Sequence, residues 1–295
     1  MSQNAAVSGE VAKHAGSDSS PAQLRELAEH GSSDSSPAQL RELACTLARD
    51  AGELLLERFQ TGVSVGVRSK STPTDLVSEA DLAAERTLRE RLRELRPQDG
   101  FLGEEGGGSE GGSSLRWVVD PLDGTVNFLF GIPQWSVSVA AQQASGEVLA
   151  GAIFDPCRGE MWAASVDGEA TLNGVPVHGS NQSELSVAML ATGLAYDAGV
   201  RAEQAQVLAE LIPRVRDIRR LGSAALDLAW TAAGRYDAYF ERSVKLWDVA
   251  AGVLVCERAG VQARELPQVG GLPAGILVAA PGLIEQLHAL VATAS

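Results

Sequence analysis

The sequence predicts an α+β fold in which an antiparallel sheet is followed by an α/β segment. Between residues 135 and 164 three apolar stretches read as successive strands, which is typical of an antiparallel sheet. From about Ser183 strands and helices alternate, as they do in α/β units. A chain of 295 residues is long enough for about two domains. We therefore expect an α+β domain at 37–184, with helices to one side of its sheet, and an α/β domain at 185–295.

The first 36 residues form an expected tail that is rich in Ser, Gly and Ala. It contains a duplication, because residues 17–28 recur as residues 33–44. Two copies are too few for a solenoid. The second copy leads into an amphipathic helix, whereas the first leads only to another Ser run. We therefore expect residues 1–36 to be disordered.

A long helix is expected to follow the tail. Apolar residues recur at helical spacing from Pro37 to Phe59. Ser35 or Ser36 can cap this helix, with the proline in its first turn. Valine then occupies every second position of residues 63–67, as in a strand or hairpin arm.

A polar loop from Lys70 to Asp81 opens a second helix. Its apolar positions run from Val77 to Leu95, and a proline two residues later ends it. Asp81 and Glu85 lie one turn apart on this helix. From the local pattern both are expected to be solvated charges on its surface.

The stretch from Phe101 to Gly108 combines a short apolar strand with two acidic residues, Glu104 and Glu105. Gly- and Ser-rich sequence follows as far as Ser114. Glycines after acidic residues are common in mobile loops at functional sites. A solvated surface loop fits the same residues, so both interpretations stay open here.

The remaining elements follow from the same periodicities and turn signals. Asn173-Gly174 marks a hairpin turn. The later elements are expected as a strand at 188–193, a helix at 202–212, a strand at 219–221, a helix from 223, a strand at 236–241, a helix at 247–258, a strand at 276–279 and a helix after 281.

Composition excludes several classes of protein. Hydrophobic residues make up 45% of the chain, yet no apolar run approaches the roughly 20 residues that cross a bilayer. The N-terminus lacks a signal pattern, so we expect a cytoplasmic protein without membrane contact. The net charge of −14 argues against nonspecific nucleic-acid binding. The three cysteines have neither metal-ligand spacing nor the pattern of a disulfide framework.

Residues 116–127, with the sequence Arg-Trp-Val-Val-Asp-Pro-Leu-Asp-Gly-Thr-Val-Asn, hold the strongest chemical signal. A buried strand from Trp117 to Val119 runs into Asp120 and Asp123, and the proline between them is expected to end it. Gly124 permits a tight turn, and Thr125 can start a helix. Two carboxylates held close together repel each other, so a cation between them is the expected relief. Hard oxygen ligands beside free N–H groups suit Mg²⁺ and a phosphate. A polar turn with a capping aspartate is the alternative that these residues leave open.

The motif Asp120-Pro-Leu-Asp-Gly-Thr-Val-Asn-Phe, together with Lys245-Leu-Trp-Asp-Val-Ala-Ala, resembles the two signatures of the inositol monophosphatase family. The loop at residues 70–77 and the Gly-Glu-Glu element at 103–105 match in the family's order. Residues 219–225 and 236–241 resemble its substrate-side segments. The resemblance covers residues 38–290 and implies a layered αβαβα fold, a homodimer and a site where two sheets meet.

The resemblance also implies the composition of the site, with two to three Mg²⁺ ions. A first ion would be held by Glu104, Asp120 and the carbonyl of Leu122, a second by Asp120, Asp123 and Asp248, and a weaker third would lie near Glu104. Thr125 and Asp81 would position and deprotonate the attacking water.

The substrate side follows in the same way. The N–H groups of Gly124 and Thr125 would hold the phosphate, and Lys70 would lie near it. Glu241 and the backbone around Ala224 would contact the polyol, with Asp248 at the border of the same pocket.

The function that this resemblance implies is Mg²⁺-dependent, lithium-sensitive hydrolysis of a phosphate monoester, with myo-inositol 1-phosphate as the expected substrate. Histidinol phosphate and fructose 1,6-bisphosphate are the alternatives within the same fold. An interaction or regulatory role in RNA processing or transcription is the alternative from another class of protein.

Overall fold

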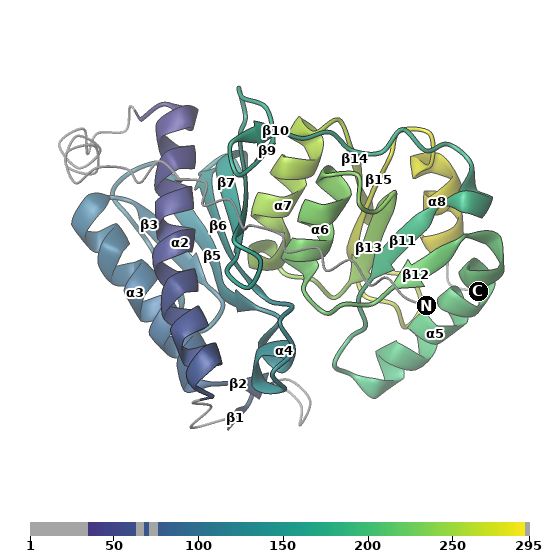
Figure 1. The fold of residues 1–295 in the computed structure, drawn as a ribbon, viewed down its shortest axis with the longest axis horizontal. Coiled ribbons are helices and arrows are strands. Elements are labelled where there is room, and N and C mark those ends of the chain that lie inside the picture. Colours follow the sequence, from purple (N-terminus) through teal and green to yellow (C-terminus); the bar gives the residue numbers. More distant parts are fainter. Residues whose placement is uncertain (1–34, 63–67, 71–75, 293–295) are drawn as a thin grey trace, which may run out of the picture.

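The computed structural model describes residues 35–62, 68–70 and 76–292. In this part of the chain helices and sheets alternate in five layers, as Figure 1 shows. From one side to the other the layers are a helix pair, a large sheet, a second helix pair, a smaller sheet and a last helix pair. The αβαβα fold that the resemblance implied is confirmed.

The helices have the bounds expected from the sequence to within a few residues. They are α2 (Pro37–Thr61), α3 (Glu79–Leu95), α4 (Thr125–Leu129), α5 (Ala198–Leu211), α6 (Ala224–Ala232), α7 (Leu246–Arg258) and α8 (Ile284–Val291), with single 3₁₀ turns at Leu185–Val187 and Ile212–Arg214.

Helix α2 shows why these bounds could be predicted. The Ser36 hydroxyl accepts the Gln39 N–H, and the Gln39 side chain accepts the Ser36 N–H, which forms a capping box. Gly62 ends the helix with a left-handed φ of 69°. Ser36 therefore belongs to the helix start and not to the expected tail. Residues 1–34 and the expected alternating arm at 63–67 lie outside the described residues.

The large sheet has eight strands within the described residues, in the order β10-β9-β8-β7-β6-β5-β3-β4. Every pair is antiparallel except β3 with β5, which is parallel. The strands are β3 (Gly100–Gly103), β4 (Gly107–Ser109), β5 (Leu115–Asp123), β6 (Ser136–Gln143), β7 (Val148–Asp155), β8 (Glu160–Ser165), β9 (Thr171–Leu172) and β10 (Val175–Pro176). A two-residue pair, β1 (Arg68–Ser69) with β2 (Leu76–Val77), lies apart from it.

The smaller sheet orders its five described strands as β12-β11-β13-β15-β14. Its bounds are β11 (Met189–Thr192), β12 (Asp217–Arg219), β13 (Ala238–Arg242), β14 (Gln262–Leu266) and β15 (Gly275–Ala279). Strand β12 begins two residues earlier than expected, and the prediction missed β14. The division into domains near residue 184 stays a prediction.

Both faces of the large sheet are covered by helices. Along β5, Trp117 and Val119 lie in the core under α2 and α3, whereas Val118 lies in the core that α6 and α7 form. This alternation follows from the two-residue period of a strand. The helices of residues 37–184 lie on one side of this sheet, as expected, and its second face is covered by helices from the C-terminal part of the chain.

The middle helix layer also packs against the smaller sheet, so it connects the two. Its core includes Ala191, Tyr239 and Val278 of that sheet. Helices α5 and α8 cover the outer face (Figure 1). None of the described helices is long and apolar enough to cross a membrane.

Candidate active site

The central motif lies at an irregularity in the large sheet. Asp120 pairs with Ser138 and Asp123 with Ser136, so β5 uses one residue more than β6 between these pairs. Pro121 lies within this bulge, where its missing N–H does not interrupt the ladder. The strand was expected to end at Val119, but it continues through the bulge. The bulge places both aspartates at one edge of a pocket.

The turn after Asp123 depends on Gly124. Its φ is 96°, and a Cβ at this position would lie 2.9 Å from the Gln134 carbonyl oxygen. Only glycine fits such a turn without strain. The turn leads directly into α4, whose first residue is Thr125.

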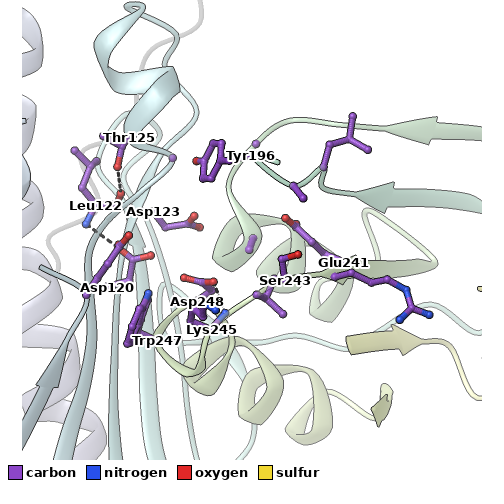
Figure 2. A pocket seen from close by; sticks show the side chains of 18 of the residues that line it. Asp120, Leu122, Asp123, Thr125, Tyr196, Glu241, Ser243, Lys245, Trp247 and Asp248 are labelled. Carbon is purple, nitrogen blue, oxygen red and sulfur yellow. Dashed lines mark hydrogen bonds between the residues drawn. The ribbon is translucent and has the colours of Figure 1, made fainter. Parts of the chain in front are cut away.

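A cavity of about 300 Å³ opens between the two sheets. Every predicted site residue except Asp81 lines it. Figure 2 shows Asp120 and Asp123 on the β5 side, Glu241 on the opposite side, and Asp248 at the start of its helix between them. The lining residues from the prediction are Lys70, Glu104, Asp120, Leu122, Asp123, Gly124, Thr125, Ala224, Glu241 and Asp248.

Several acidic side chains line the pocket together. Asp120 is only 2% exposed. Burial, followed by the carboxylates of Glu104, Asp123 and Asp248, raises its pKa well above the ordinary value. Burial likewise raises the pKa of Asp248 well above its usual range. Groups that raise one another's pKa in this way favour a bound cation, because the cation would stabilise their charged forms.

Asp123 connects the large sheet to the middle helix layer. One of its oxygens accepts the Ser223 hydroxyl at 2.6 Å and the Ala225 N–H at 2.7 Å, at the N-terminus of α6. Burial raises the pKa of Asp123 to about 6, against the lowering effect of these hydrogen bonds. Asp248 accepts the Lys245 N–H at 2.6 Å in the first turn of α7.

Lys70 is a cation at the rim of the pocket. Its ammonium lies 2.7 Å from Glu104 Oε1 and 2.6 Å from Glu105 Oε1. Burial lowers the pKa of Lys70, but the two glutamates together outweigh burial and raise it. Burial raises the pKa of Glu105 to about 7, although Lys70 opposes the shift.

The donor set suits a hard divalent cation. Carboxylate and carbonyl oxygens are the ligands that Mg²⁺ prefers. Across the described residues, however, no three His, Cys, Asp or Glu side chains form a ready-made ligand group. Glu104 is turned to Lys70, and Asp123 and Asp248 are each bonded to backbone N–H groups. The residues fit the ion by the chemistry of their oxygen donors and by their position around one cavity, while their side chains are turned to the partners just named.

Asp81 lies behind the pocket wall. It is fully buried and accepts the Thr125 hydroxyl at 2.8 Å. Glu85 is also buried, at 4% exposure. The expectation that both were solvated surface charges was wrong. The face of α3 that carries them lies against α4 and against the turn that carries Glu104 and Glu105, which we call the acidic turn.

Glu241 forms the far wall. Its carboxylate accepts the Tyr239 hydroxyl at 2.8 Å. Burial raises its pKa to about 7, although the Tyr239 hydrogen bond opposes the shift. A Cβ on Gly193 would lie 1.9 Å from this carboxyl group, so the glycine leaves the space that it occupies.

The sequence prediction missed several residues that shape the pocket. Arg220, Tyr196 and Ser243 line it, and Ser223 holds Asp123. Ser223 was expected only as the start of a helix. Arg220 and Ser223 lie within the segment that resembles the family's substrate side, which is the signal that could have identified them.

Comparison with known proteins agrees with the motifs. Residues 36–294 match the sequence profile of the inositol monophosphatase family. The inositol-1-monophosphatase of Mycobacterium leprae is 47% identical over 235 residues, covering 76% of this chain and 80% of the relative. A protein of Xylella fastidiosa described as Nus factor SuhB is 43% identical, covering 72% of this chain and 77% of its own.

Solved structures show the same similarity. The structure of Mycobacterium tuberculosis SuhB superimposes with a TM-score of 0.74 at 38% identity, covering 88% of this chain and 97% of that one. The extragenic suppressor protein SuhB of Bartonella henselae gives a TM-score of 0.77 at 33% identity, covering 83% and 95%.

Proposed function

Because the chain belongs to the inositol monophosphatase family, we propose that it is a Mg²⁺-dependent phosphatase whose substrate is myo-inositol 1-phosphate. The observation that carries the proposal is the convergence of Glu104, Asp120, Asp123 and Asp248 on one cavity between the two sheets. Phosphatase activity is the broader part of this proposal, and the inositol ester is the finer part.

The metal ligands in this proposal are Glu104, Asp120, the Leu122 carbonyl, Asp123 and Asp248. Bound there, two or three Mg²⁺ ions would lower the pKa of water and stabilise negative charge on the phosphate and the leaving oxygen. The buried carboxylates would then stay ionised. Lys70 would contribute a further positive charge at the rim, where it now contacts Glu104.

In this proposal the remaining groups of the site bind the substrate and orient the attacking water. The N–H groups of Gly124 and Thr125, at the start of α4, would donate to the phosphate. Thr125 and Asp81 would orient the attacking water and accept its proton. Glu241 and the backbone at Ala224 would contact the hydroxyls of the polyol from the opposite wall.

Parallel assays of phosphate esters test the proposal. Inositol 1-phosphate, histidinol phosphate, fructose 1,6-bisphosphate and p-nitrophenyl phosphate would be compared with Mg²⁺ and with excess EDTA. We expect Mg²⁺-dependent release of phosphate, the highest kcat/KM on inositol 1-phosphate, and inhibition by millimolar Li⁺. A higher kcat/KM on another ester would make that ester the proposed substrate in place of inositol 1-phosphate. Absence of Mg²⁺-dependent hydrolysis of all four esters would overturn the proposal that the chain is a phosphatase.

One comparison favours a second function. The Xylella fastidiosa relative is described as a Nus factor, so a regulatory role in transcription or RNA processing is the candidate from another class. A chain acting only in this way would bind its partners equally well after the acidic residues of the pocket are neutralised. The expected cytoplasmic location and homodimer belong to the proposal for either function.

A further inference from the structure

Glu85 is a buried carboxylate to which the proposed chemistry gives no role. Its side chain lies under the turn that carries Glu104 and Glu105. Glu85 Oε2 accepts the Glu105 N–H at 2.8 Å, and Oε1 accepts the Gly106 N–H at 2.9 Å. Two hydrogen bonds to an ionised acceptor fix the backbone of the turn more firmly than neutral bonds would.

Arg89, one turn further along α3, completes this arrangement. Its Nε and Nη2 lie 3.0 Å and 2.9 Å from Glu85 Oε1. The same Nη2 donates to the Gly107 carbonyl at 2.8 Å, and the guanidinium lies 4.1 Å from the centre of the Phe101 ring. One helix therefore holds the N–H side and the carbonyl side of the acidic turn.

Two glycines show that the turn is closely fitted to this pair. A Cβ on Gly103 would lie 2.5 Å from Glu85 Oε2. A Cβ on Gly106 would lie 2.6 Å from Glu85 Oε1 and 2.7 Å from Arg89 Nη2. Gly108, by contrast, has its nearest neighbour at 3.5 Å, so a methyl group fits there.

The two sides of the turn face different groups. Its backbone N–H groups are bound to Glu85, while the side chain of Glu104 points to Lys70 and lines the cavity. We propose that Glu85 is a positioning residue that, together with Arg89, holds Glu104 in place as a Mg²⁺ ligand. This inference rests on the proposed function. Glu85 acts through the backbone and does not itself reach the cavity lining.

The test measures binding of Mg²⁺ to the full chain by calorimetry, without substrate. Glu85→Gln should weaken Mg²⁺ binding by about 10- to 100-fold, as is typical when an outer-shell partner of a ligand is lost. Glu90→Gln is the matched control, because Glu90 is an exposed glutamate on the same helix. It should bind Mg²⁺ like the wild type.

A second pair of variants leaves all charges in place. Gly106→Ala should displace the turn and weaken Mg²⁺ binding, whereas Gly108→Ala should not. A merely structural role would lower the Tm of Glu85→Gln and Gly106→Ala without changing the Mg²⁺ affinity of the folded protein. Equal affinity in wild type, Glu85→Gln and Gly106→Ala would overturn the inference alone. A wild type that does not bind Mg²⁺ would overturn the proposed function, and the inference with it.

Discussion

The hydroxyl of Thr125 donates a hydrogen bond to Oδ1 of Asp81 at 2.8 Å, a contact between residues 44 positions apart. The same hydroxyl lies 3.1 Å from the Leu122 carbonyl, but it has one proton, and the charged acceptor binds it more strongly. Asp81 is held in turn by the N–H and hydroxyl of Ser78. The Thr125 oxygen is therefore left as an acceptor at the pocket wall.

Replacement of Thr125 tests this relationship. Thr125→Val should lower kcat by about 10²- to 10⁴-fold with little change in KM, because orientation and proton transfer are lost but substrate contacts are not. Thr125→Ser keeps the hydroxyl and should retain most of the activity. Steady-state kinetics on one phosphate ester suffice. Equal activity of the Val and Ser variants would remove the hydroxyl from the mechanism.

The location of Asp81 also shows where prediction from sequence stopped. Helical spacing predicted α2 and α3 well, and a capping serine marked the start of α2, because these signals depend on neighbours within one or two turns. The same local pattern made Asp81 and Glu85 look solvated. Their partners, Thr125 and the turn after Gly103, are distant in sequence, so only the order of the family motifs could suggest a role for Asp81.

The architecture shows a similar limit. The consecutive apolar residues Trp117, Val118 and Val119 indicate a buried strand, but they do not show which helices cover its second face. Strand β14 (Gln262–Leu266) was missed because its residues are mostly polar and exposed, as edge strands often are. Tyr196 comes to the pocket from another part of the chain, and nothing in its local sequence marks it as a site residue.

Asp120→Asn should lower kcat at least 100-fold, since in the proposal this side chain serves two metal ions. The fold should be retained, because the substitution removes one charge from a buried cluster of acids. We therefore expect a Tm no lower than that of the wild type. Asp167→Asn, at an exposed position, is the control. Near wild-type turnover in Asp120→Asn would contradict the metal assignment.

Asp99 and Arg96 form a buried ion pair, with side chains 2% and 3% exposed. The Trp117 indole N–H and the Ser113 hydroxyl also donate to Asp99. Asp99→Ala leaves Arg96 without its charged partner and should reduce the free energy of unfolding by about 3–5 kcal/mol. Urea denaturation measures the change.

An exposed ion pair supplies the comparison for Asp99. Asp50 and Arg91 are 30% and 40% exposed, so Asp50→Ala should cost less than about 1 kcal/mol. A similar cost for both substitutions would show that burial does not determine the strength of the Arg96–Asp99 pair.

Asp227 should make stability depend on pH. It is 1% exposed, and its Oδ1 has no hydrogen-bond partner among the described residues. Burial, followed by Glu241 and Asp123, raises its pKa well above the ordinary value, with Arg220 acting in the opposite direction. The folded state therefore binds the proton more tightly than the unfolded state does. The resulting stability is complete below the unfolded pKa of about 3.9 and is lost as the pH rises through the folded pKa.

Asp227→Asn removes this titration. Relative to the wild type, the free energy of unfolding of the variant should increase as the pH rises from 4 to 8. The size of the increase should correspond to the difference between the folded and unfolded pKa of Asp227. Urea denaturation of both proteins across this range measures it. Parallel curves would show that folding does not change the pKa of Asp227.

Glu241 is expected to recognise the polyol. Its carboxylate is fixed by the Tyr239 hydroxyl at 2.8 Å, and the absence of a side chain on Gly193 leaves room for it. A carboxylate at the pocket wall can accept hydrogen bonds from two neighbouring hydroxyls of a ring. Glu241→Gln should therefore reduce kcat/KM for inositol 1-phosphate by several-fold or more. A site arranged to hydrogen-bond substrate hydroxyls discriminates strongly between substrates that have them and substrates that lack them. p-Nitrophenyl phosphate has no hydroxyls to bind, so its hydrolysis should barely change.

Tyr239→Phe should show the same selectivity with a smaller loss, since it keeps the carboxylate but removes the donor that orients it. Tyr236→Phe is its matched control: Tyr236 is also buried, but within the described part of the chain its hydroxyl has no hydrogen-bond partner. That variant should hydrolyse both esters like the wild type. Equal losses on both esters in Glu241→Gln would assign Glu241 to the metal site or the fold. No loss on either ester would remove it from the site altogether.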